Sequence, residues 1–435
     1  VRVAYVAAGA AGMYCGTCIH DNTLAAALQK AGHEVALLPL YTALRTDEED
    51  VSLRQVFFGA VNVYLQQKSG IFRHTPRLLD RQLDRPALLN AVSRFAASTD
   101  AADLGALTLS MLRAQDGRQR KELARLIEWM RDFRPDVVQV ANSMLLGIGV
   151  EIKRNLGVPI VCGLTGEDIF LDELPEPYRS DVAAEMRRRA RRTDALIATS
   201  RYYADAMREF LELPEDRIHV VHLGINLASI GIEPHRRDAG GPLTLGYMAR
   251  ICPEKGLHIL LEAFREVARR RPELPLGVRA AGYVGGRDRD YFEAQRRRVE
   301  DWGLADRVEL LGEVDLEGKR RLLLDSDIVS VPTTYREPKG LFVLEALAHG
   351  VPVVQPAHGA FPELLELTGG GLLVEPDSVP ALADGLLELL EDGARRQELG
   401  RRGREAVRAS FDSDTMAART LDIYRSLAQE AHSPT

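Results

Sequence analysis

The sequence has few cysteines, no long hydrophobic run and no excess of positive charge. Four cysteines in 435 residues are too few for a disulfide-based scaffold, which favours a reducing compartment such as the cytoplasm. No apolar run reaches the roughly 18 residues that a membrane-spanning helix needs. The formal net charge of −7 argues against general nucleic-acid binding, because that affinity comes from clustered lysine and arginine. We expect a cytoplasmic protein with at most peripheral membrane contact and no nucleic-acid partner.

The arginine runs and the N-terminal segment are consistent with this expectation. Arginine gathers at 187–192 and 296–298, but acidic residues lie near each run, so we expect solvated helix faces. The N-terminus lacks the basic segment of a signal peptide and runs into a glycine-rich turn, which predicts a first β-strand.

Short apolar runs, each followed by a helical pattern, recur at spacings typical of βα units. They lie at 3–7, 35–40, 137–141, 160–163, 195–199 and 219–222, and again at 243–247, 276–282, 308–311, 328–332, 351–355 and 372–374. Continuous apolar strands alternating with helices indicate parallel sheets covered on both faces. The predicted fold class is therefore α/β, with two doubly wound, Rossmann-like domains and ligands at the carboxyl ends of the strands and in the cleft between the sheets.

The domain boundaries follow from where this alternation stops. We expect an N-terminal domain over 1–226, a linker over 227–242, a C-terminal domain over 243–410 and a final helix over 411–435 that crosses back to the first domain. The segment 42–119 fits the alternation least well and includes a plausible strand at 61–65. Two interpretations stay open for it, an acceptor pocket or a purely packing role.

The strongest chemical signal is 335–354, which reads YREPKGLFVLEALAHGVPVV. It follows a predicted strand, and a short helix from Leu341 begins there, so its unpaired N–H groups offer an anion site. Glu345 stands among leucines, where a carboxylate needs hydrogen-bond donors. A hydroxyl-rich ligand would supply them, and so would the backbone or an arginine.

A second signal is 246–256, which reads GYMARICPEKG, follows another strand and enters a helix. Arg250 can contact phosphate oxygens in bidentate fashion, and Lys255 adds a point charge five residues later. Two cations and a helix N-terminus can neutralise a diphosphate without a metal ion.

Together these residues resemble the retaining GT-B glycosyltransferases of family four, the glycosyl transferases group 1. Glu337 and Glu345 have seven residues between them, with Arg250 and Lys255 upstream. Further matches lie in the first glycine-rich turn and at 31–35, 165–168, 224–226 and 358–363.

The resemblance implies a retaining, metal-independent hexosyltransferase that needs no cofactor and moves a sugar from a nucleoside-diphosphate donor to a hydroxyl acceptor. Glu345 would accept hydrogen bonds from the ribose, whereas Glu337 and the backbone at Lys339, Gly340 and Leu341 would hold the donor sugar. Arg250 and Lys255 would stabilise the departing diphosphate. In that family the acceptor hydroxyl attacks the sugar on the face from which the diphosphate leaves, and the leaving phosphate helps to remove the acceptor proton.

Three further residues are candidates for donor binding: Gly12, Thr165 and Glu363. Thr165 stands where many relatives have a histidine, and Lys339 where an aromatic residue is commoner. Cys15 and Cys18 lie near His20 and Asp21, but no second cysteine pair completes a zinc site, so packing of a functional loop is favoured.

The alternatives are a nucleotide-sugar epimerase or a glycoside phosphorylase on the same scaffold, and a nucleotide-sugar-binding protein without turnover. A nicotinamide dehydrogenase is less favoured, because the glycine spacing after the first strand departs from the dinucleotide fingerprint.

Overall fold

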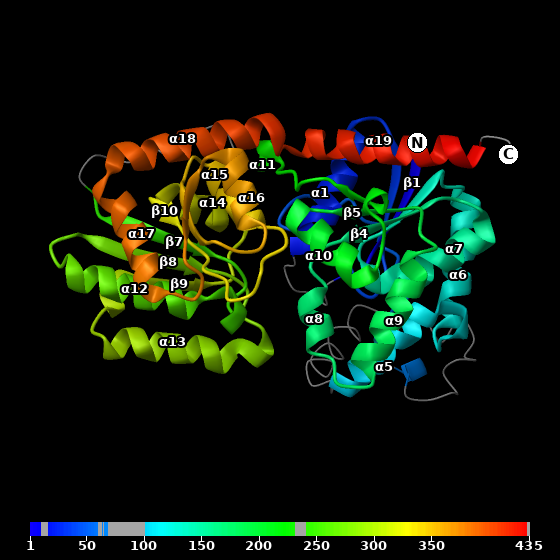
Figure 1. The fold of residues 1–435 in the computed structure, drawn as a ribbon, viewed down its shortest axis with the longest axis horizontal. Coiled ribbons are helices and arrows are strands. Elements are labelled where there is room, and N and C mark those ends of the chain that lie inside the picture. Colours follow the sequence, from blue (N-terminus) through cyan, green and yellow to red (C-terminus); the bar gives the residue numbers. More distant parts are fainter. Residues whose placement is uncertain (10–15, 60–62, 64, 68–100, 231–240, 433–435) are drawn as a thin grey trace. The chain divides into compact units, whose positions relative to one another are not determined.

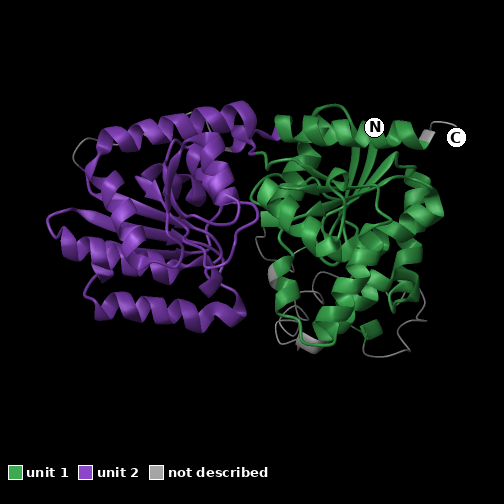
Figure 2. Ribbon diagram, viewed as in Figure 1, with its two compact units in different colours: residues 1–224, 414–435 green, residues 225–413 purple. Residues whose placement is uncertain are grey.

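The computed structural model describes residues 1–9, 16–59, 63, 65–67, 101–230 and 241–432. The chain divides into two compact units, shown in different colours in Figure 2. Unit 1 comprises Val1–Gly224 and Asp414–Thr435, and unit 2 comprises Ile225–Ser413. Each unit contains a six-stranded sheet whose neighbouring strands are parallel (Figure 1). The predicted fold class, two Rossmann-like parallel-sheet domains, is confirmed.

Unit 1 alternates strands and helices, and its sheet has the order β2-β1-β3-β4-β5-β6. Its strands are β1 (Arg2–Ala7), β2 (Glu34–Pro39), β3 (Val137–Val140), β4 (Ile160–Leu164), β5 (Ala195–Ala198) and β6 (Ile218–Val220). Its helices are α1 (Gly16–Lys30), α5 (Ala101–Arg113), α6 (Arg120–Phe133), α7 (Leu146–Leu156), α8 (Asp168–Asp172), α9 (Tyr178–Ala190) and α10 (Arg201–Leu211).

The last helix, α19 (Ser413–His432), packs almost wholly within unit 1. It places Met416, Leu421 and Tyr424 in the same buried cluster as the strand residues Val3 and Tyr5. The Tyr424 hydroxyl donates to Gln139 Oε1 on the central strand β3. Burying each of these apolar side chains contributes about 1.5–3 kcal/mol, which explains why an amphipathic terminal segment docks there.

Unit 2 repeats the pattern with the order β12-β11-β10-β7-β8-β9. Its strands are β7 (Leu243–Met248), β8 (Leu276–Ala281), β9 (Val308–Gly312), β10 (Ile328–Val329), β11 (Val353–Pro356) and β12 (Gly371–Val374). Its helices are α11 (Leu227–Ile230), α12 (Leu257–Arg270), α13 (Arg289–Asp301), α14 (Leu316–Asp325), α15 (Leu341–Ala348), α16 (Phe361–Thr368), α17 (Val379–Glu391) and α18 (Gly393–Ser410).

The strand predicted at 61–65 is wrong for the residues of that segment that the structure describes. Val63 and residues 65–67 are helical. Val63 is 1% exposed, and the Gln66 side chain donates to Glu122 Oε1 on α6 at 3.0 Å. Packing onto a neighbouring helix has overridden the β-propensity of this valine-rich run.

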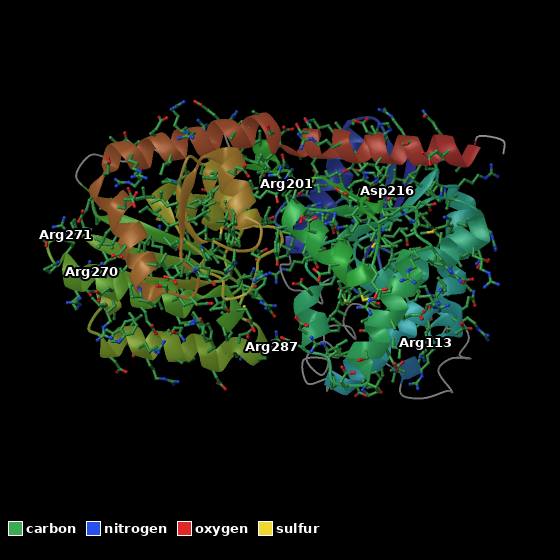
Figure 3. All side chains as sticks on the ribbon, in the orientation of Figure 1. Arg113, Arg201, Asp216, Arg270, Arg271 and Arg287 are labelled. Atoms are coloured by element: carbon green, nitrogen blue, oxygen red, sulfur yellow. The ribbon has the colours of Figure 1, made fainter. Side chains whose placement is uncertain are left out.

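The arginine-rich stretches lie on helices or just after them, and several of their arginines are ion-paired. Arg188 and Arg189 both pair with Glu185, and Arg191 pairs with Glu212. At the end of α12, Arg270 and Arg271 (labelled in Figure 3) donate to Asp384 and Glu391 on α17. Arg189 departs from the expected solvated face, because its side chain is 6% exposed and also donates to the Arg113 carbonyl.

Candidate active site

The two sequence motifs in unit 2 follow the two strands at which the strand order reverses. β7 and β10 are neighbours in the sheet. From β7 the chain continues to β8 on one side, and from β10 it continues to β11 on the other side. Ligands of doubly wound sheets bind outside the carboxyl ends of strands at this point. Arg250 and Lys255 follow β7, whereas Glu337 follows β10. The Thr334 N–H donates to the Glu254 carbonyl at 2.9 Å, which ties the two loops together.

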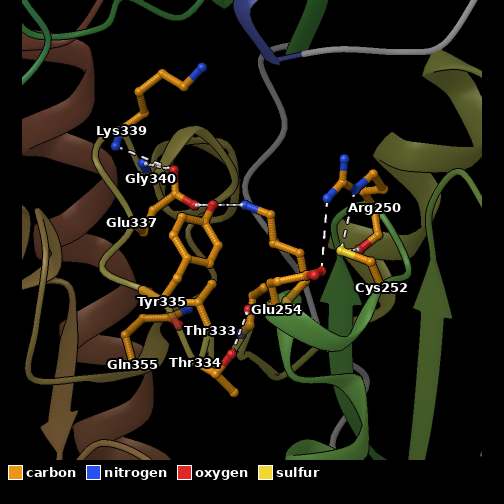
Figure 4. A network of polar contacts seen from close by, with 12 residues as sticks. Arg250, Cys252, Glu254, Thr333, Thr334, Tyr335, Glu337, Lys339, Gly340 and Gln355 are labelled. Atoms are coloured by element: carbon orange, nitrogen blue, oxygen red, sulfur yellow. Dashed lines mark hydrogen bonds and ion pairs between the residues drawn. The ribbon is translucent and has the colours of Figure 1, made fainter. Parts of the chain in front are cut away.

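Glu337 and Lys255 form the centre of this site, and the network around Glu337 is drawn in Figure 4. The Lys255 Nζ lies 2.6 Å from Glu337 Oε2, although 82 residues separate the two in sequence. The Tyr335 hydroxyl donates to the same carboxylate oxygen. The other oxygen, Oε1, accepts from the backbone N–H groups of Lys339 and Gly340, each at 3.3 Å.

The ionisation of Glu337 is set by these contacts. Burial alone raises the pKa of this carboxyl, but the charge of Lys255 and the hydrogen bonds from Lys255 and Tyr335 outweigh it and lower the pKa to about 2. Burial and the neighbouring Glu337 raise the pKa of Tyr335 well above its ordinary value. Glu337 is therefore a carboxylate and Tyr335 a neutral phenol throughout the neutral pH range.

Arg250 lies on the loop after β7, beside Cys252 and Glu254 (Figure 4). Its Nε donates to the Cys252 sulfur at 3.3 Å, and its terminal nitrogen lies 3.9 Å from Glu254 Oε2. The side chain is 38% exposed, so the guanidinium keeps a face accessible to an anion. The long ion-pair distance makes Glu254 a weak competitor for it.

Gly282 fixes the loop that carries Arg250. A Cβ at this position would lie 1.6 Å from the Ala249 carbonyl oxygen, which belongs to the backbone and cannot move aside. We expect Gly282→Ala to destabilise the chain by about 1–3 kcal/mol, as overpacking does. Gly286→Ala is the matched control, because a Cβ there meets nothing within 4 Å. Urea unfolding of both variants measures the difference, and equal free energies of unfolding would contradict the expected clash.

Glu345 lies on α15 and is 8% exposed. Its Oε1 accepts from Lys319 Nζ on α14 at 2.6 Å. This contact comes from a lysine, whereas a ligand, a backbone group or an arginine was expected from the sequence. Lys319 was missed, because it lies on a helix whose sequence reads as an ordinary charged surface.

The remaining candidates in unit 2 lie at helix starts after the strands. Gly340 adopts a φ of 69° before α15, a left-handed conformation that glycine takes without strain, and Leu341 is the first residue of that helix. Lys339 is half-buried and is joined to Glu337 through its own N–H. Glu363 lies in the first turn of α16 and is 7% exposed.

Thr165 belongs to unit 1. Its N–H donates to Glu167 Oε2 at 2.9 Å, and the same carboxylate accepts from Ser143 and from the Tyr203 hydroxyl. Gly12 and Cys15 lie outside the described residues, whereas Cys18 is buried.

The described residues contain neither a cluster of metal ligands nor a helix that could span a membrane. In that part of the chain, no group of three or more histidine, cysteine, aspartate or glutamate residues is placed to hold a metal ion. Among the helices that the structure describes, each is too short or too polar to span a bilayer.

Two family models match the chain and together cover more than half of it. The model for glycosyl transferases group 1 matches residues 233–406, and the model for glycosyltransferase family 4 matches residues 109–229. The first match contains Arg250, Lys255, Glu337 and Glu345, and the second contains Thr165.

Individual relatives agree with these models. A GDP-mannose-dependent alpha-(1-6)-phosphatidylinositol monomannoside mannosyltransferase of Mycobacterium tuberculosis is 34% identical over 188 residues, 42% of this chain and 47% of the relative. This match therefore spans about half the length of that relative. A glycogen synthase of the same species is 27% identical over 296 residues, 68% of this chain and 69% of its own.

Among solved structures, sucrose-phosphate synthase of Thermosynechococcus elongatus is similar in fold. It has a TM-score of 0.70 with 18% sequence identity, over 99% of this chain and 100% of the other. The resemblance read from the sequence is confirmed, and the chain belongs to glycosyltransferase family 4, within the glycosyl transferases group 1.

Proposed function

We propose that this chain is a retaining glycosyltransferase that moves a hexose from a nucleoside-diphosphate sugar to a hydroxyl acceptor in the cytoplasm. The observation that carries the proposal is the Lys255–Glu337 ion pair beside Arg250, at the carboxyl ends of β7 and β10. Family membership and the nucleotide-sugar donor named for the mannosyltransferase relative support the same reaction. GDP-mannose is accordingly a donor to test, together with other hexose nucleotides.

The cations supply the main chemical assistance in this mechanism. As the bond between the sugar and the diphosphate breaks, negative charge grows on the leaving phosphate oxygens. Arg250 offers an accessible guanidinium there, and Lys255 offers an ammonium that is 17% exposed. Preorganised charges in a partly buried site stabilise such a transition state without reorganising at the moment of reaction. The acceptor attacks on the same face, and its proton passes to the leaving phosphate.

The carboxylates bind rather than react in this proposal. Glu337 is held by Lys255, Tyr335 and two backbone N–H groups, so it is rigid and ionised. These four donors fill its acceptor sites, so a sugar hydroxyl would bond to it in place of one of them. Glu345 is kept in place by Lys319 and accepts from the ribose. No protein nucleophile is required.

A nucleotide screen followed by product analysis tests the proposed function. UDP, GDP, ADP and TDP are compared by thermal shift, and the matching hexose nucleotides are then incubated with candidate acceptors. Mass spectrometry is expected to find an acceptor heavier by one hexose. Sugar interconversion without an acceptor would indicate an epimerase, phosphate-dependent breakdown of a glycoside would indicate a phosphorylase, and tight binding without turnover would indicate a binding protein.

Glu345→Ala is expected to weaken binding of the best nucleoside diphosphate by roughly 10-fold or more, the size of a lost hydrogen bond to a charged group. Isothermal titration measures the dissociation constant. Glu366→Ala is the control, because Glu366 is an exposed glutamate on α16. Unchanged affinity in Glu345→Ala would remove Glu345 from the nucleotide site.

A further inference from the structure

Tyr335 occupies the middle of the network in Figure 4, where its hydroxyl lies between Lys255 and Glu337. It is the second residue before Glu337 in the loop that follows β10. Its backbone is anchored on one side by the Thr333 hydroxyl, which donates to the Tyr335 carbonyl at 3.0 Å. The neighbouring Thr334 N–H holds the Glu254 carbonyl. The phenol therefore extends from a fixed stretch of chain.

The phenol contacts both charged partners at once. Its hydroxyl donates to Glu337 Oε2 and accepts from Lys255 Nζ. The same ammonium lies 4.8 Å from the centre of the Tyr335 ring and 5.6 Å from that of Phe342. One side chain thus supplies a donor to the carboxylate and an acceptor to the ammonium.

If the proposed function holds, the diphosphate of the donor competes with Glu337 for Lys255. Lys255 must then turn part of its hydrogen bonding from Glu337 toward phosphate oxygens. A buried carboxylate that loses its cation is costly unless another donor holds it. The Tyr335 hydroxyl is such a donor, because it reaches the same oxygen, Oε2, from a separate position in the chain.

We propose that Tyr335 is a positioning residue for sugar transfer. Its hydroxyl lets Lys255 divide its hydrogen bonds between Glu337 and the incoming diphosphate, and it keeps Glu337 in place while Lys255 contacts the phosphate. The inference rests on the proposed function and adds to it a residue that acts through Lys255 and Glu337. Without the hydroxyl, Lys255 stays bound to Glu337 and is less available to the charge that develops on the leaving group.

Tyr335→Phe tests this, because it removes only the hydroxyl. We expect kcat to fall about 10- to 100-fold, as for one hydrogen bond to a charged group, with the donor KM changed by less than about 3-fold. Tyr335→Leu also removes the ring that packs beside Lys255, and we expect it to raise the donor KM and lower the Tm as well. A purely structural role predicts that Tm falls in Tyr335→Phe while kcat per folded molecule stays the same.

Tyr424→Phe is the matched control, because it also removes a buried tyrosine hydroxyl that donates a hydrogen bond, in this case to Gln139 Oε1 in unit 1. The kcat and KM of this variant are expected to equal those of the unmodified chain. If the unmodified chain transfers sugar and Tyr335→Phe does so at the same kcat, the inference is overturned and the proposed function stands. If the unmodified chain transfers no sugar to any acceptor, the proposed function fails and the inference fails with it.

Discussion

Arg250→Ala is expected to slow sugar transfer by about 10²- to 10³-fold, the typical effect of removing one preorganised charge from a developing oxyanion. The loss should fall mainly on kcat, because the guanidinium acts most strongly when the diphosphate departs. Stability should change by less than about 1 kcal/mol, since this side chain is 38% exposed and its ion pair with Glu254 is long, at 3.9 Å. Steady-state kinetics and urea unfolding on the same preparations measure the two effects.

Two further variants sharpen this test. Arg250→Lys keeps the charge but loses the planar pair of donors, and we expect it to recover only part of the rate. Arg269→Ala is the control, because Arg269 is 72% exposed on α12 and pairs with Glu266 on the same helix. Equal kcat in Arg250→Ala and Arg269→Ala would rule out a role for Arg250 in transfer.

Lys255→Met is expected to abolish measurable transfer and also to destabilise unit 2 by about 3–5 kcal/mol, as breaking a buried ion pair does. The variant leaves Glu337 3% exposed without its cation. Removing both charges, in Lys255→Met with Glu337→Gln, should restore part of the stability but none of the activity. Fully additive losses in the double variant would show that the two side chains do not interact in solution.

The same pair predicts a pH dependence with a definite sign. In the folded chain the pKa of Glu337 is lowered from 4.5 to about 2, so folding favours the ionised form. Its contribution to stability is complete above about pH 4.5 and is lost as the pH falls toward 2. The free energy of unfolding of the unmodified chain should exceed that of Glu337→Gln by a constant amount from pH 6 to 8. That difference should shrink below about pH 4.5, and a difference independent of pH down to 3 would contradict the assigned ionisation.

The sequence predicted the sheets well because parallel strands buried on both faces read as continuous apolar runs. The run at 243–247 appears as β7, Leu243–Met248, and the helix expected after 246–256 appears as α12, Leu257–Arg270. The sequence signal was weaker for α1, where residues such as Cys18 and Asp21 are buried without an obvious apolar pattern.

For the site, the sequence indicated which loops carry charge but not which side chains meet. The proximity of Lys255 to Glu337 depends on β7 and β10 being neighbours, and strand order is not readable from local patterns. Lys319 and Tyr335 were missed for the same reason, because each acts through a tertiary contact with a glutamate. The backbone N–H groups of Lys339 and Gly340 were expected to face the donor, whereas in the structure they donate to Glu337.

The most direct test of the account is the anomeric configuration of the product. Proton NMR follows the reaction of an α-linked hexose nucleotide with an acceptor, catalysed by the unmodified chain and by Arg250→Ala in parallel. The account predicts a new glycoside with the donor's α configuration, formed rapidly by the unmodified chain and at least about 100-fold more slowly by the variant. A β-linked product, or equal rates for the two chains, would contradict it.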